Sequence, residues 1–137
     1  MSGPLRHPLR VRYGECDPQG VVFNAHYLAW FDIALTELWR AALGSYDAMV
    51  KRGVDVVVAE ATVRYLRPAR FDDELDLCIS ISHLGTSSIV SDHEILRDGE
   101  AITRGQTRHV CVLADALIKA PIPDWLRESL QPWTVED

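Results

Sequence analysis

Residues 14–27 place a carboxylate in a turn directly before a helix. Pro18 and Gly20 interrupt regular structure around Asp17, so we expect Asp17 on a loop. Helical periodicity begins a few residues later, and a helix start presents unpaired N–H groups and the positive end of a dipole. A carboxylate beside such donors suits hydrolysis, because one group attacks or acts as a base while the other stabilises an oxyanion. The alternative is that Asp17 only caps its turn, as Asp often does before Pro or Gly.

Other nucleophiles and metal ligands have weaker patterns. Cys16 lies between Glu15 and Asp17, and negative neighbours disfavour a thiolate, so Cys16 is interpreted as a small, partly buried residue. The histidines form no HxxH or HxxxH pair, and we therefore expect no metal site. They are His7, His26, His83, His93 and His109.

The segment around Asp17 resembles the signature of a known family, the hotdog-fold acyl-CoA thioesterases of the 4-hydroxybenzoyl-CoA thioesterase/YbgC-like type. The similar stretch, residues 12–32, reads RYGECDPQGVVFNAHYLAWFD. The residues that carry the pattern are Asp17, Pro18, Gly20, Val21, Val22, Phe23, Tyr27 and Asp32. The resemblance extends more loosely over nearly the whole chain, including residues 67–77 and 121–130.

The resemblance implies an acyl-CoA or aroyl-CoA substrate, no cofactor, and Asp17 as the catalytic residue. Asp17 would either attack the thioester carbonyl or activate water, and the sequence leaves both routes open. Backbone N–H groups near Asn24 and Ala25 would polarise the carbonyl; losing one such donor costs other acyl-transfer enzymes about 3 kcal/mol. Phe23, His26 and Tyr27 are the expected substrate contacts. Phe23, Tyr27 and Trp30 could line an aromatic pocket; the alternative is that these aromatic residues belong to the core.

Two positions depart from the YbgC pattern. Asn24 stands where many members have His, and Leu35 replaces an Arg that is common on the helix. These departures favour the hydroxybenzoyl-CoA-like or general acyl-CoA branch. Glu37, a carboxylate on the helix, leaves open a dehydratase or hydratase that acts on acyl thioesters. A non-catalytic acyl-CoA-binding protein, in which Asp17 is dispensable, is the third alternative.

Coenzyme A carries a diphosphate and a 3′-phosphate, so an acidic protein that binds it needs a local basic patch. Arg64, Arg67 and Arg70 supply one within seven residues, around Pro68. The alternative is that these side chains are only solvated.

Length and composition restrict the class of protein. A chain of 137 residues suits a single domain, expected to span residues 1–137. A net charge of −6 argues against a nucleic-acid or anionic-membrane partner. We expect no membrane span, because no apolar run is long enough, and no targeting signal. Cys16, Cys78 and Cys111 are widely spaced, which favours reduced thiols in a cytoplasmic protein.

The elements that must position these residues follow from periodicity. Residues 5–13 predict a strand with Leu9, Val11 and Tyr13 on one face. Residues 24–43 predict a helix that begins at an Asn24 cap and ends at Gly44. Its expected apolar stripe consists of Leu28, Phe31, Leu35, Leu38 and Ala42. Residues 46–52 predict a second, short helix.

Beyond Gly53 the apolar period changes to two, which predicts strands over residues 54–66, 75–84, 87–96 and 100–113. Asp98 and Gly99 predict a two-residue hairpin between the last two strands. The fold class is therefore α+β. The resemblance makes it a hotdog fold, in which an antiparallel β-sheet wraps around one long central α-helix. Such a sheet leaves an unpaired edge, so we expect a homodimer or homotetramer with its active sites at the interface.

Overall fold

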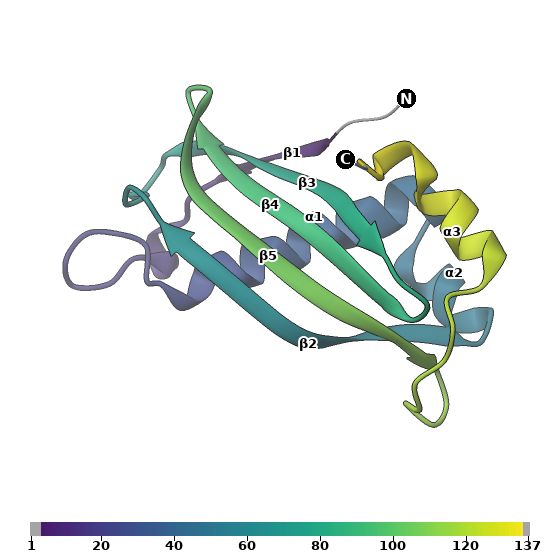
Figure 1. Ribbon diagram of the computed structural model, residues 1–137. Coiled ribbons are helices and arrows are strands. Elements are labelled where there is room, and N and C mark those ends of the chain that lie inside the picture. The colour runs from purple at the N-terminus through teal and green to yellow at the C-terminus, as the bar shows by residue number, and fades with distance from the viewer. Residues whose placement is uncertain (1–3, 136–137) are drawn as a thin grey trace.

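The computed structural model describes residues 4–135, which form a five-stranded antiparallel sheet folded against helix α1 (Figure 1). The strands are β1 (Leu5–Arg10), β2 (Val54–Tyr65), β3 (Glu74–Leu84), β4 (Ser88–Arg97) and β5 (Glu100–Leu113). Their order in the sheet is β1-β3-β4-β5-β2. The predicted α+β hotdog fold is confirmed.

Helix α1 (Ala25–Leu43) buries a face that differs in part from the predicted stripe. Its buried residues are Tyr27, Trp30, Phe31, Ala34, Leu35, Leu38 and Trp39. Leu28, expected in the stripe, is 41% exposed, and Tyr27 takes its place in the core. Successive helical residues point about 100° apart, so anchoring Tyr27 against the sheet turns Leu28 outward.

The ends of α1 follow the prediction only in part. Gly44 ends the helix with a positive φ of 89°, as expected. Asn24 occupies the N-cap position, but its own backbone is helical and its side chain makes no capping hydrogen bond. Tyr13 is a second correction: β1 stops at Arg10, and Tyr13 lies in the 3₁₀ turn η1 (Tyr13–Glu15), 80% exposed.

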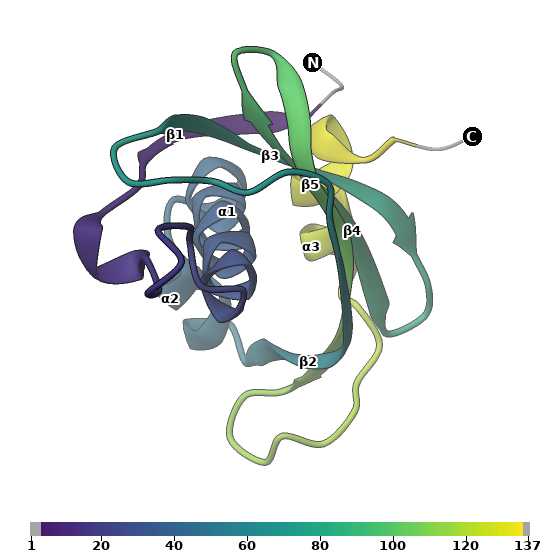
Figure 2. The same cartoon turned by 90° about the vertical axis from the view of Figure 1, so that its left-hand side faces the viewer.

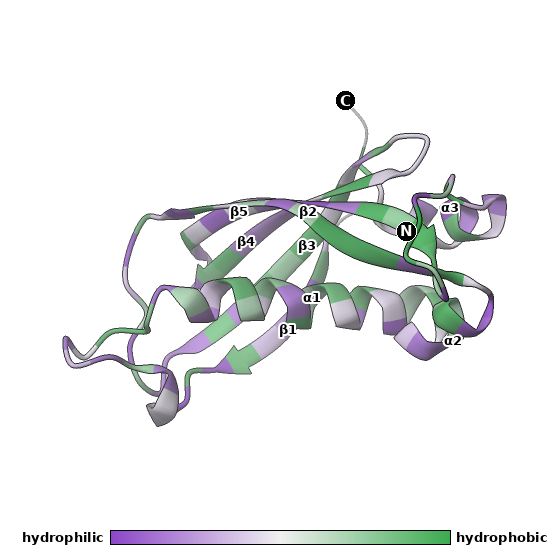
Figure 3. Cartoon of the chain, turned by 90° about the horizontal axis from the view of Figure 1, so that it is seen from below, coloured by the Kyte–Doolittle hydropathy of each residue, from purple (hydrophilic) through white to green (hydrophobic). Residues whose placement is uncertain are grey.

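The sheet curves around α1, as Figure 2 shows in a view along the helix. Irregular pairing in β2, near Ala59, and at two places along β3 and β4 adds to the twist that strands have by themselves. Gly105 of β5 lets the helix approach closely, because a Cβ there would lie 2.5 Å from Cε2 of Phe31. Figure 3 shows α1 lying along this face of the sheet, with hydrophobic bands on both.

The remaining elements complete the sheet and cover its end. β4 and β5 are joined by Asp98 and Gly99, with positive φ angles of 53° and 80°, as the predicted two-residue hairpin requires. The short helix α2 (Tyr46–Lys51) follows α1, and α3 (Asp124–Leu130) continues into η2 (Gln131–Trp133). None of the helices in the described chain has both the length and the apolar character needed to cross a membrane.

Candidate active site

Asp17 lies on a small loop whose two ends are joined. Cys16 and Val22 form an isolated antiparallel bridge at the base of this loop. Within it, the Asp17 N–H donates to the Val21 carbonyl at 2.9 Å, and the Gly20 N–H donates to the Asp17 carbonyl at 2.9 Å. Gly20 has a positive φ of 81°, which only glycine adopts without strain. The predicted loop directly before the helix is therefore confirmed.

The two oxygens of the Asp17 carboxylate have different surroundings. Oδ1 accepts a hydrogen bond from the Gln19 N–H at 2.8 Å, which is the expected turn cap. The other oxygen accepts no hydrogen bond from any described residue. Asp17 is partly exposed and lines a hollow of about 520 Å³. The other residues that line it are Tyr13, Gly14, Cys16, Pro18, Gly20 and Phe71.

The start of α1 offers two backbone donors directly after the Asp17 loop. Within residues 4–135 the N–H groups of Asn24 and Ala25 have no hydrogen-bond acceptor, as is usual in the first turn of a helix. Tyr65, the last residue of β2, donates its hydroxyl hydrogen to the Asn24 carbonyl at 3.0 Å and holds this turn against the sheet. No sequence pattern pointed to Tyr65, because 41 residues separate it from Asn24.

The three predicted aromatic contacts differ in exposure. Phe23 is 47% exposed and meets the His26 ring edge-on, with centroids 6.2 Å apart. Tyr27 is buried, and its hydroxyl accepts the Ala69 N–H at 3.2 Å. Burial raises the pKa of this hydroxyl, so it stays protonated. Tyr27 and Tyr65 also line a second hollow, of about 240 Å³, next to the helix start.

The three predicted arginines do not share one environment. The Arg67 guanidinium pairs with Glu100, and Arg67 lines the second hollow. Arg64 is exposed on β2, on the opposite face from Tyr65, since neighbouring strand residues alternate. Arg70 is exposed, and among the described residues its guanidinium has no carboxylate partner. It directly precedes Phe71, which lines the Asp17 hollow.

Glu15 is a site residue that sequence reasoning missed. It is only 7% exposed, and its carboxylate accepts hydrogen bonds from the Arg12 backbone, the Arg12 guanidinium and the Trp30 indole. The sequence showed an acidic residue two positions before Asp17, but nothing in the spacing indicated a contact with Trp30.

Glu37, the alternative catalytic carboxylate, is engaged elsewhere. It pairs with Arg40 one helical turn further on and lies 4.0 Å from Nδ1 of His7 on β1. Its side chain is 26% exposed. The geometry therefore ties Glu37 to the flank of α1 that faces β1, as a paired surface carboxylate.

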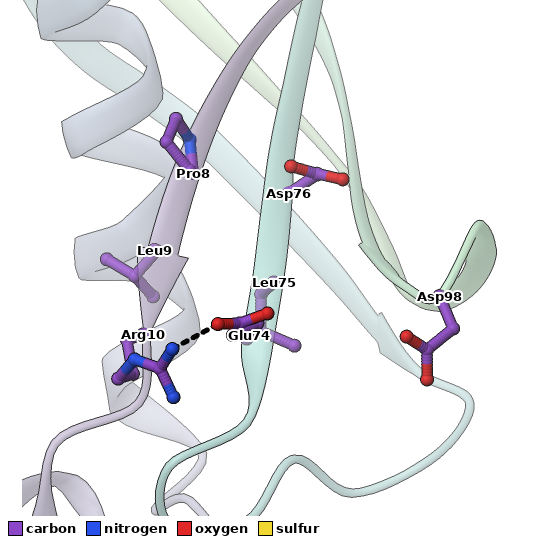
Figure 4. A pocket seen from close by; sticks show the side chains of 7 residues that line it. All are labelled: Pro8, Leu9, Arg10, Glu74, Leu75, Asp76 and Asp98. Atoms are coloured by element: carbon purple, nitrogen blue, oxygen red, sulfur yellow. Dashed lines mark hydrogen bonds and ion pairs between the residues drawn. The ribbon is translucent and has the colours of Figure 1, made fainter.

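A further hollow, of about 480 Å³, lies where β1 and β3 meet the β4–β5 hairpin (Figure 4). Its charged lining consists of Arg10, Glu74, Asp76 and Asp98, and Arg10 pairs with Glu74. None of the predicted site residues lines it. In the part of the chain that the structure describes, no three His, Cys, Asp or Glu residues come together as metal ligands.

Comparisons with known proteins show the family to which the chain belongs. The family model of the thioesterase-like superfamily matches residues 11–130. The chain belongs to this superfamily. It is 34% identical over 109 residues to the acyl-CoA thioester hydrolase YbgC of Escherichia coli O6:H1, covering 79% of this chain and 81% of the relative. It is 25% identical over 127 residues to a 1,4-dihydroxy-2-naphthoyl-CoA hydrolase of Synechococcus elongatus, covering 88% and 90%.

A solved structure supports the fold of this superfamily member. The crystal structure of a 1,4-dihydroxy-2-naphthoyl-CoA thioesterase from Synechocystis superposes with a TM-score of 0.84 at 21% identity, over 94% of this chain and 96% of the other. Of the two relatives above, YbgC is the more similar in sequence. The branch expected from Asn24 and Leu35 is therefore not supported by these two relatives and stays a prediction.

Proposed function

We propose that this thioester hydrolase cleaves acyl-CoA thioesters at the hollow beside Asp17. The observation that carries the proposal is a carboxylate with one free oxygen on a closed loop that directly precedes two open backbone N–H groups at the start of α1. The names of the relatives support coenzyme A as the thiol part of the substrate, since both act on CoA thioesters. They differ in acyl group, so the acyl chain of this enzyme's substrate is left open.

The chemistry assigns a separate task to each group. In one route, the free oxygen of Asp17 attacks the carbonyl carbon, the C–S bond breaks, and water later hydrolyses the acyl-aspartate anhydride. In the other route, Asp17 takes a proton from a water molecule that attacks the same carbon. In both, the N–H groups of Asn24 and Ala25 hydrogen-bond the oxyanion, and the CoA thiolate leaves and is protonated.

Replacing Asp17 by Asn tests this proposal. The amide keeps the size of the side chain and an oxygen for the Gln19 N–H, but it is a poor nucleophile and a poor base. We expect kcat to fall by about 10² to 10⁴-fold, with KM and thermal stability little changed. The measurement is thiol release from a panel of acyl-CoAs.

Asp115→Asn is the matched control, because Asp115 is another exposed loop carboxylate and makes no hydrogen bond with a described residue. Asp115→Asn should leave kcat unchanged. A kcat near that of the wild type for Asp17→Asn would remove Asp17 from the mechanism. If no variant and no wild-type protein releases thiol while acyl-CoA binds, the non-catalytic alternative holds.

The dehydratase alternative receives no support from the site. It would need Glu37 and a His that are free to exchange protons with substrate. Glu37 lies 4.0 Å from Nδ1 of His7, but it is paired with Arg40, and neither Glu37 nor His7 lines a hollow described above. The same assay separates the two reactions, because hydration of an enoyl-CoA releases no thiol.

We also propose that two copies of the chain pair through β2 and that the enzyme acts in the cytoplasm. The pairing is supported by the exposed edge of β2, whose residues 57–62 are all exposed. The location is supported by the three cysteines, Cys16, Cys78 and Cys111, whose thiols are free.

A further inference from the structure

Glu15 is a buried carboxylate at the junction between the Asp17 loop and α1. Its Oε1 accepts the Arg12 backbone N–H at 2.7 Å. Its Oε2 accepts the Trp30 indole N–H at 2.8 Å and an N–H of the Arg12 guanidinium at 2.9 Å. Trp30 is fully buried in the face of α1 that packs on the sheet. The carboxylate of Glu15 is therefore connected to the buried face of α1, in the second turn of the helix.

The backbone of Glu15 is connected to the far end of the Asp17 loop. Its carbonyl accepts the Phe23 N–H at 2.9 Å, directly beyond the Cys16–Val22 bridge. Phe23 immediately precedes Asn24, whose N–H is one of the two open donors. One residue thus holds both partners of the proposed chemistry: Asp17, two positions later in the chain, and the start of α1.

The charge of Glu15 makes this junction sensitive to small displacements. Burial by itself raises the pKa of Glu15, but the hydrogen bonds from Arg12 and Trp30 outweigh it and lower the pKa below its ordinary value. The carboxylate is therefore ionised at neutral pH. A buried charge that loses a hydrogen-bond partner is strongly destabilised, so the Trp30 indole and the Glu15 carboxylate must stay in contact.

We propose that Glu15 is a positioning residue that sets the separation between the Asp17 carboxylate and the N–H groups of Asn24 and Ala25. This inference rests on the function proposed for Asp17 and adds a residue that does not touch the substrate. Catalysis depends steeply on such geometry, because a misplacement of about 1 Å can cost about 10²-fold in rate. A positioning role predicts a loss in kcat with little change in KM.

Two variants cut the connection from opposite sides. Glu15→Gln removes the charge at nearly constant volume, and Trp30→Phe removes the indole donor but keeps an aromatic ring. Trp39→Phe is the matched control, because Trp39 is also buried in α1 but its indole donates to no described residue. We expect kcat to fall tenfold or more in Glu15→Gln and Trp30→Phe, with KM within about twofold. Trp39→Phe should keep the wild-type kcat.

Combination with Asp17→Asn distinguishes positioning from general destabilisation. If Glu15 acts through Asp17, adding Glu15→Gln to Asp17→Asn lowers the residual kcat by less than twofold. A purely structural role would instead lower the melting temperature and leave the kcat of the folded enzyme unchanged. If neither buried variant folds, the kcat of Arg12→Gln tests the positioning role instead. The Arg12 side chain is 67% exposed, so its loss leaves the core intact.

The outcomes separate the two proposals. The positioning role is overturned if Asp17→Asn is inactive while Glu15→Gln and Trp30→Phe, or Arg12→Gln in their place, keep a kcat within twofold of the wild type. An active Asp17→Asn variant overturns the proposed function itself, whatever the Glu15 variants do.

Discussion

The two carboxylate oxygens of Asp17 differ in their hydrogen bonds, and this difference leaves one of them available for the proposed chemistry. One caps the turn through the Gln19 N–H, and the other is free within the described structure. Capping and catalysis therefore do not exclude each other here. The cap holds the side chain in one orientation in the loop, so little rotamer entropy is lost when substrate arrives.

The arginines near the site lead to a prediction about the CoA phosphates. Arg70 has no carboxylate partner among the described residues and directly precedes Phe71, which lines the Asp17 hollow, whereas Arg67 is already paired with Glu100. If Arg70 contacts a phosphate, Arg70→Ala should raise KM for CoA thioesters about fivefold, the value of one exposed charge pair. It should raise KM much less for pantetheine thioesters, which lack the nucleotide, and leave kcat unchanged.

Steady-state kinetics at low and high salt check this prediction, since salt screens exposed charge pairs. Arg64→Ala and Arg67→Ala belong in the same series. Arg108→Ala is the control, because Arg108 is an exposed arginine of β5 without a carboxylate partner in residues 4–135. Equal KM changes for both types of substrate would show that these arginines are only solvated.

For individual residues, the sequence predicted groups that lie close together along the chain and missed contacts between residues far apart in it. Asp17, the loop and the open N–H groups of Asn24 and Ala25 lie within nine residues, so the turn signals and the family pattern located them. Glu15 and Tyr65 reach their partners over 15 and 41 residues. Only the packing of η1 and β2 against α1 creates those contacts, and no spacing in one sequence encodes it.

The interface between α1 and the sheet contains an unusual pair of buried histidines. His93 of β4 stacks on Phe31 with ring centroids 4.2 Å apart, and its Nε2 is 3.0 Å from the Thr107 hydroxyl. His109 of β5 is buried nearby. The pKa of His93 is lowered to about 3 by burial and by His109, and burial also lowers that of His109. Both rings are therefore neutral at pH 7, and the helix packs on an uncharged face.

This packing predicts acid sensitivity. The folded pKa of His93 lies below the ordinary value of about 6.5, so only the unfolded chain binds a proton there as the pH falls. The contribution of neutral His93 to the free energy of unfolding is then fully present above pH 6.5. It decreases toward pH 3, by up to about 1.4 kcal/mol per pH unit for one such group. Urea unfolding of the wild type and of His93→Gln between pH 7 and pH 4.5 measures the difference in slope.

The His93→Gln variant should show a shallower decrease in stability with acid than the wild type. His83→Gln is the control, because His83 is a solvent-exposed histidine of β3. Identical slopes for the wild type and His93→Gln would mean that His93 is accessible to protons in the folded state.

At the level of elements, periodicity predicted which helices and strands exist, and in what order, better than it predicted which of their faces are buried. The β5 bounds and the Asp98-Gly99 hairpin are as expected, because the turn residues are explicit in the sequence. The prediction of which side of α1 faces the sheet was partly wrong, because Tyr27 and Leu28 are both apolar enough for the core. The Ala69 N–H and the Tyr65 ring, contributed by distant segments, select Tyr27.

The two edges of the sheet differ in their capacity to pair with another chain. β1 is a short edge that carries Pro8 and the charged Arg6 and Arg10, features that protect an edge from pairing. β2 has 12 residues and no proline, and its exposed stretch includes Val57 and Val58. An unprotected edge of this length is expected to be paired, and a second copy of β2 is a partner with the same length and pattern.

Pairing through β2 predicts a dimer, or a tetramer of such dimers, when light scattering is measured at micromolar concentration. Val58 is 57% exposed near the middle of β2, where antiparallel pairing of two β2 strands would bring the two copies of this residue close together. Val58→Lys should therefore set like charges against each other and shift the protein toward monomer. Val135→Lys is the control, because Val135 is 45% exposed and is hydrogen-bonded to β3, away from the β2 edge. Thiol release should fall together with the dimer fraction, since the resemblance places the active sites at the interface. A monomeric wild type with full activity would contradict both the pairing and an interface site.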